Sequence, residues 1–145
     1  MSDEAATHPI IFEHLFFVRS VVISVPGHIP NPEMLPMGPE NTIHVSKIEG
    51  DARRYEGKMR TVMNLAADPQ YPYSIDMECF AHFLVDDTLT EEEANRGVHI
   101  TAHNVLYGAI REAVSWITGR QPYGPMQLGL SVLRTTPPKA ETQAP

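Results

Sequence analysis

The sequence predicts an α+β fold in which a four-stranded antiparallel sheet packs against one long helix. Two observations carry this prediction. The first two thirds of the chain contain strand-like segments separated by turn residues, and the last third contains one long helical pattern. With 145 residues, the chain fits a single domain whose core needs no disulfides. We expect that domain at residues 10–134, between disordered tails at 1–9 and 135–145, which are polar and contain prolines.

Four segments have the character of strands: 11–25, 42–48, 55–66 and 73–85. The first is rich in β-branched and aromatic residues and is apolar on both faces. The last two alternate between apolar and polar residues, so one face of each is expected to be buried. The side chains expected on those buried faces are Tyr55, Met59, Thr61, Met63, Leu65, Tyr73, Ile75, Met77, Cys79, Ala81, Phe83 and Val85. Short turns between consecutive strands predict an antiparallel meander.

The connection between the first two strands contains five prolines. They are Pro26, Pro30, Pro32, Pro36 and Pro39. Proline lacks a backbone N–H and has a fixed φ, so this segment can be neither helix nor central strand. We therefore expect an irregular connection.

The helical pattern begins after a capping box, formed by Thr90 and Glu93, which predicts a short acidic helical turn. Thr101 is expected to cap the long helix that follows, and Gly119 to end it. Apolar residues cover more than half of its circumference, which is wider than the stripe of a typical surface helix. The residues of this arc are Ala102, His103, Val105, Leu106, Tyr107, Ala109, Ile110, Ala113, Val114, Trp116 and Ile117. The opposite face consists of Thr101, Asn104, Gly108, Arg111, Glu112, Ser115 and Thr118. Such a helix is expected to pack against the sheet on one side and a second subunit on the other.

Composition excludes several classes of protein. The net charge is −7, and basic residues do not cluster, which argues against nucleic-acid binding. No stretch of about 18 apolar residues or charged-then-apolar leader is present, so neither a membrane span nor a signal peptide is predicted. Cys79 is the only cysteine, which favours a reducing, cytoplasmic location.

The sequence offers no set of residues for catalysis or for a cofactor. His99 and His103 are four positions apart, as in helical metal pairs, but no third ligand lies at a recognisable spacing. We therefore interpret them as a helix-start and a partly buried histidine, with no metal. Neither a nucleophile elbow nor a phosphate-binding glycine loop is found, so a binding protein is favoured over an enzyme.

Several segments, taken in order, resemble one known family. They are 16–26, a strand that closes on a proline; 37–45, with Met-Gly-Pro-Glu before a strand; 55–65; 73–85; 104–112, with Arg-Glu; and the loop 119–128. Together they resemble SecB, the bacterial protein-export chaperone, and SecB-like proteins, over about residues 12–133. The resemblance implies four antiparallel strands with helices on one side, and a dimer of dimers that sandwiches the long helices between the sheets. The interface positions expected in such a tetramer are Asn104, Tyr107, Gly108, Arg111 and Ser115.

The resemblance also implies a function. SecB-like proteins bind extended, unfolded polypeptides in hydrophobic grooves without ATP and pass precursors to the translocase motor SecA. Here the groove is expected between the sheet and the segment after the long helix. Its expected client-binding residues are Met34, Leu35, Met37, Tyr123, Met126, Leu128, Leu130 and Val132. The corresponding docking positions for SecA are Ser20, Ser24, Asp76 and Glu78.

This sequence departs from the family pattern at three places. Ser20 and Ser24 replace acidic residues of the first strand, and Met37 replaces a tryptophan of the groove. The apolar pattern ends at residues 134–138, so the second long helix is expected to be short or absent. Two functions therefore remain open: a general export holdase, and a chaperone or structural protein dedicated to one partner, such as a toxin–antitoxin pair. Unfolded or precursor polypeptides are the expected partners of the first.

Overall fold

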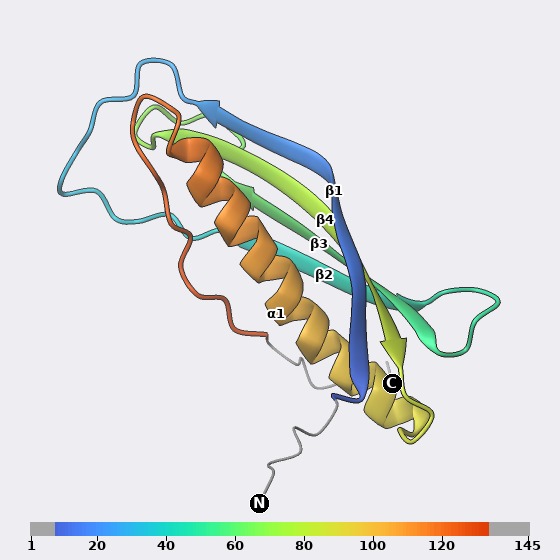
Figure 1. The fold of residues 1–145 in the computed structure, drawn as a ribbon. Coiled ribbons are helices and arrows are strands. Elements are labelled where there is room, and N and C mark those ends of the chain that lie inside the picture. The colour runs from blue at the N-terminus through green and yellow to red at the C-terminus, as the bar shows by residue number, and fades with distance from the viewer. Residues whose placement is uncertain (1–7, 134–145) are drawn as a thin grey trace, which may run out of the picture.

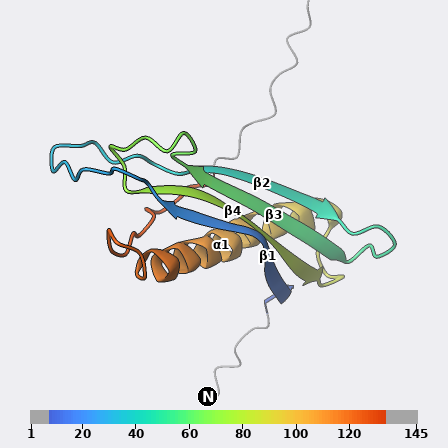
Figure 2. The same ribbon diagram turned by 90° about the horizontal axis from the view of Figure 1, so that it is seen from above.

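A computed structural model describes residues 8–133. Its elements are β1 (Ile10–Ser24), β2 (Glu40–Lys47), β3 (Arg54–Met63), β4 (Tyr73–Val85) and α1 (Glu91–Thr118). The strands form one antiparallel sheet, and α1 lies along one of its faces (Figures 1 and 2). The predicted α+β class, a four-stranded sheet with one long helix, is confirmed. Apart from His8 and Pro9, the expected tails at 1–9 and 135–145 lie outside the described residues.

The order of the strands differs from the expected simple meander. The sheet has the order β1-β4-β3-β2, so β1 pairs with the last strand of the chain and not with β2. Only β2, β3 and β4 follow one another as hairpins. The proline-rich connection between β1 and β2 is long enough to carry the chain from one edge of the sheet to the other (Figure 1).

Helix α1 is longer than predicted, because the acidic turn and the long helix are one element. Thr90 is the N-cap, and its hydroxyl accepts a hydrogen bond of 3.2 Å from the backbone N–H of Glu93. The expected cap at Thr101 is wrong, since Thr101 lies inside the helix. Gly97 continues the helix because α1 passes close to β1 there: a Cβ at this position would lie 2.8 Å from Cδ1 of Ile10. The helix ends before Gly119, as predicted.

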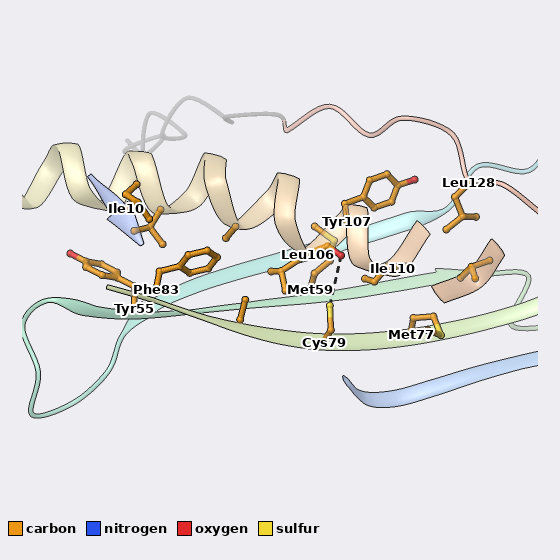
Figure 3. Close-up of a cluster of buried hydrophobic side chains, with 14 of the residues drawn as sticks. Ile10, Tyr55, Met59, Met77, Cys79, Phe83, Leu106, Tyr107, Ile110 and Leu128 are labelled. Atoms are coloured by element: carbon orange, nitrogen blue, oxygen red, sulfur yellow. Dashed lines mark hydrogen bonds between the residues drawn. The ribbon is translucent and has the colours of Figure 1, made fainter. Parts of the chain in front are cut away.

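The core lies between α1 and the inner faces of β3 and β4 (Figure 3). Residues at a spacing of four along α1 face the sheet; they are Ala94, Val98, Ala102, Leu106, Ile110, Val114 and Thr118. The buried face of β4 is the predicted one, from Tyr73 to Val85. Each step of four residues turns this row by about 40° around the helix axis, and the sheet on which the row packs is itself twisted.

One predicted core position is wrong. Leu65 is 57% exposed, because β3 ends at Met63 and Asn64 turns the chain with a φ of 52°. Trp116, a residue of the apolar arc, which was expected to meet the sheet on one side and a second subunit on the other, is 61% exposed and lies on the outside of α1, where the guanidinium carbon of Arg120 is 3.8 Å from the centre of a Trp116 ring. The apolar arc of the helix is therefore wider than the row that meets the sheet.

Candidate functional site

A groove of about 860 Å³ lies between the proline-rich loop and the segment that follows α1. Its lining is largely apolar and, within residues 8–133, contains no lysine, arginine, aspartate or glutamate. Of the six methionines between residues 8 and 133, four line it, namely Met34, Met37, Met63 and Met126. The unbranched methionine side chain adapts to differently shaped apolar partners, so this lining suits varied sequences.

Six of the eight residues predicted to bind clients meet in this groove. They are Met34, Leu35, Met37, Met126, Leu128 and Leu130. Leu35 and Leu130 are 81% and 87% exposed, whereas Leu128 is 3% exposed and belongs to the core. The other two, Tyr123 and Val132, do not line it. The Tyr123 hydroxyl instead donates a hydrogen bond of 3.2 Å to the carbonyl of Val25.

One wall of the groove belongs to residues 125–133, which we call the strap. The strap is extended and runs back beside α1 toward the start of the helix (Figure 1). Three side chains spaced four residues apart on α1 contact it. Arg111 Nε donates a hydrogen bond of 2.8 Å to the Leu128 carbonyl, and the Tyr107 hydroxyl donates one of 2.5 Å to the Gly129 carbonyl. His103 Nε2 lies 3.2 Å from Ser131 Oγ.

Tyr107 reaches the strap from the side of α1 that faces away from the sheet (Figure 3). Its side chain is buried, and burial raises the pKa of the phenol above the ordinary value. The hydroxyl therefore keeps its proton and remains a hydrogen-bond donor to the strap. Asn41 at the start of β2 adds a hydrogen bond of 3.1 Å from Nδ2 to Ser131 Oγ. The strap is thus fixed to both the helix and the sheet.

Thr118 fixes the turn that leads into the strap, and its role was missed by the sequence analysis. It was assigned to the polar face of the helix, but it is fully buried. Its hydroxyl donates a hydrogen bond of 2.6 Å to the Val114 carbonyl and accepts one of 2.7 Å from the N–H of Met126. The spacing of four from Val114 was the signal that could have placed Thr118 on the buried row.

The four positions predicted to dock SecA lie on two different sides of the sheet. In the register of β1 and β4, Ser20 and Ser24 pair with Met77 and Tyr73, whose side chains face the helix. Asp76 and Glu78 alternate with those residues and therefore point to the outer face. In addition, the Ser24 hydroxyl donates a hydrogen bond of 2.8 Å to Oε1 of Gln121. These four residues do not form one patch.

The positions predicted for the subunit interface also separate into two groups. Asn104 and Gly108 are exposed on α1, and Ser115 is half-buried. Tyr107 and Arg111, in contrast, are engaged by the strap of the same chain. The exposed part of the helix extends to Ile100 and Trp116, which are 47% and 61% exposed.

The described residues contain neither a metal cluster nor a spanning helix. Between residues 8 and 133, no three histidine, cysteine or carboxylate side chains come close enough to hold a metal ion together. His99 and His103 thus have no third ligand there. In the same range, α1 is not apolar enough to cross a bilayer.

Comparison with solved structures shows which folds this chain resembles. The SecB-like chaperone of Mycobacterium tuberculosis, solved in complex with a ChAD peptide from the antitoxin HigA1, superposes with a TM-score of 0.64. The match covers 87% of this chain and 93% of that one, at 22% sequence identity. The chain has a SecB-like fold.

A second solved structure is more distant. A protein of unknown function from Streptococcus agalactiae shares the SecB-like fold with a TM-score of 0.52 and 11% identity, over 86% of this chain and all of that one (100%). No protein-family model matches the sequence, and no curated protein matches it. The likeness is therefore one of architecture, carried by the sheet and the long helix.

Proposed function

We propose that this protein is an ATP-independent holdase that binds unfolded polypeptides in the groove between the proline-rich loop and the strap. The observation that carries the proposal is the uncharged, methionine-rich lining of that groove, which joins six residues from two distant parts of the sequence. By keeping precursors unfolded in the cytoplasm, such a protein maintains their competence for export. This is a binding role and requires no catalytic group.

Binding would be driven by apolar burial. Each Å² of apolar surface removed from water contributes about 25 cal/mol. The exposed rim residues Leu35 and Leu130 are the first to meet a client, and the methionines then adapt to its side chains. Affinity for a long client would come from several grooves of one oligomer acting together, an effective-concentration effect.

The proposed assembly is a tetramer, a dimer of dimers, in which the outer face of α1 is covered by other copies. Ile100 and Trp116 support this proposal, because they are large apolar side chains exposed on one helix. A partner such as SecA would have to contact both sides of the sheet to reach all four proposed docking positions, because Ser20 and Ser24 lie on the other side from Asp76 and Glu78.

A second candidate is a chaperone dedicated to one partner. It is favoured by the M. tuberculosis relative, which was solved with a peptide from an antitoxin. A general holdase should suppress the aggregation of several unrelated unfolded proteins at stoichiometric amounts without ATP. A dedicated chaperone should act on a single partner and leave the others to aggregate.

Variants of the groove test the proposed site directly. The double variant Leu35→Glu and Leu130→Glu places two charges at the apolar rim while altering only exposed side chains. Leu128 is unsuitable for this test, because it is buried in the core. Leu65→Glu is the matched control, since Leu65 is exposed but does not line the groove. Aggregation suppression should be lost in the double variant and kept in the control. Wild-type protein that protects no client would overturn the proposed function.

A further inference from the structure

The strap is held to α1 through its backbone, and this attachment leaves the side chain of Leu130 free at the groove. Arg111 and Tyr107 donate hydrogen bonds to two successive carbonyls, those of Leu128 and Gly129. Leu130, the next residue, is 87% exposed and lines the groove. The attachment therefore does not consume the apolar surface that the groove offers.

Side chains of α1 hold the part of this wall that lines the groove. The Leu128 side chain is packed into the core. Gly129 and Leu130 belong to neither a helix nor a β-strand of residues 8–133. Extended segments outside helices and strands open easily. Tyr107 and Arg111 are the helix side chains that hold the carbonyls of Gly129 and Leu128, directly before the groove-lining Leu130.

We propose that Tyr107 and Arg111 are positioning residues for client binding, which hold the strap as the second wall of the groove. This inference rests on the proposed holdase function and changes the role expected for both residues from the sequence. They act within one protomer, by donating hydrogen bonds to backbone carbonyls of the strap. The subunit interface does not require them.

The test uses the full-length protein with Tyr107→Phe and Arg111→Met combined. These changes remove both donors but keep the ring and the aliphatic stem that pack at these positions. Arg120→Met is the matched control, because its guanidinium also donates to a backbone carbonyl, that of Trp116, without touching the strap. The probe is reduced, carboxymethylated α-lactalbumin, which stays unfolded. Loss of two hydrogen bonds that fix the wall should weaken its binding by about tenfold or more.

A second measurement reports on the strap itself. A nitroxide attached to Leu130→Cys should show slow motion in the parent protein and faster motion when Tyr107 and Arg111 are replaced. Cys79 is buried and stays unlabelled in the folded protein. Arg111→Lys keeps one donor and should restore part of the affinity. The particle mass should be the same for all variants.

Each other result has a defined meaning. A faster nitroxide with unchanged client affinity would overturn the wall role, and an unchanged nitroxide would overturn the attachment. Dissociation of the particle would assign Tyr107 and Arg111 to the subunit interface and overturn the inference as well. Wild-type protein that binds no client would refute the proposed function, whereas the nitroxide would still decide whether these two residues fix the strap.

Discussion

Arg60 on β3 donates two hydrogen bonds, of 3.0 and 2.9 Å, to the carboxylate of Asp76 on β4. Arg19 on β1 lies on the other side of β4 and donates a third, of 3.4 Å. The hydrogen bonds from Arg60 are the main reason why the pKa of Asp76 lies below its ordinary value, against a smaller opposite effect of burial. Asp76 thus links three neighbouring strands on the outer face of the sheet.

Replacing Asp76 with asparagine should destabilise the protein by about 1–3 kcal/mol near neutral pH, because charge-assisted hydrogen bonds are lost. A lowered folded pKa means that the carboxylate stabilises the folded state above its unfolded pKa of about 3.9. That contribution disappears as the pH falls through the folded pKa. Urea unfolding of both proteins should therefore give different free energies near pH 7 that converge as the pH falls through the lowered folded pKa of Asp76. A difference that is independent of pH would contradict this role of Asp76.

Gly57 on β3 lies where α1 passes close to the sheet. A Cβ at this position would be 2.9 Å from Cβ of Ala102 and 3.3 Å from Cδ1 of Leu106. Gly57→Ala should lower the free energy of unfolding by about 1–3 kcal/mol, because the helix must shift. Gly38→Ala is the control, since a Cβ there has no neighbour within 4 Å. Thermal unfolding measures the stability of both variants. Equal unfolding midpoints would show that the helix shifts without a loss of stability.

A charge on the exposed face of α1 should break the proposed assembly without unfolding the protomer. Gly108 is exposed, and a side chain there meets nothing within 4 Å of its Cβ in the same chain. Glutamate favours a helix more than glycine does, so Gly108→Glu should not destabilise the isolated fold. Light scattering should report a particle smaller than the proposed four chains. Asn95→Glu, near the start of the helix, should leave the mass unchanged; a variant at Gly108 of wild-type mass would exclude this face from the interface.

Cys79 should be chemically inert in the folded protein. Burial raises the pKa of its thiol to about 12, and Sγ lies 3.9 Å from the carbonyl of Leu106 (Figure 3). The thiolate is the reactive form, and it is scarce at ordinary pH. A disulfide reagent at about pH 8 should therefore label Cys79 only after unfolding, whereas an introduced Ser46→Cys on the exposed face of β2 should react at once. Rapid labelling of native Cys79 would show that the core opens frequently.

The sequence predicted the buried faces of the strands best where one face is buried and the other is exposed to solvent. In β3 and β4 that condition holds, and the alternation from Tyr55 and from Tyr73 identifies the face toward α1. Strand β1 is apolar on both faces, so its pattern could not show that it pairs with β4 across the sheet. The helix start was misplaced for a related reason. In the sequence, Gly97 looks like an interruption of the helix. The structure explains the glycine by the close approach of Ile10, which is far away in the sequence.

The groove was easier to anticipate than the contacts that shape it. Apolar residues within loop-like segments, such as Leu35 and Leu130, can be recognised in the sequence. The structure brings both to the same groove. The attachment of the strap joins a side chain to a backbone carbonyl 22 positions away, from Tyr107 to Gly129. A carbonyl has no sequence signature, because every residue carries one. For this reason the sequence assigned Tyr107 and Arg111 to a surface between subunits.

The prolines of the loop have a consequence for the release of clients from the proposed binding groove. Pro30, Pro32, Pro36 and Pro39 line the groove, and none of them carries a backbone N–H. A polypeptide lying there cannot pair with this wall as an added β-strand, because a continuous backbone hydrogen-bond ladder needs both N–H donors and carbonyl acceptors along it. Contacts on this wall are therefore made largely by side chains and exchange one at a time. On the proposed function, a bound polypeptide could therefore leave this wall without first breaking a ladder of backbone hydrogen bonds.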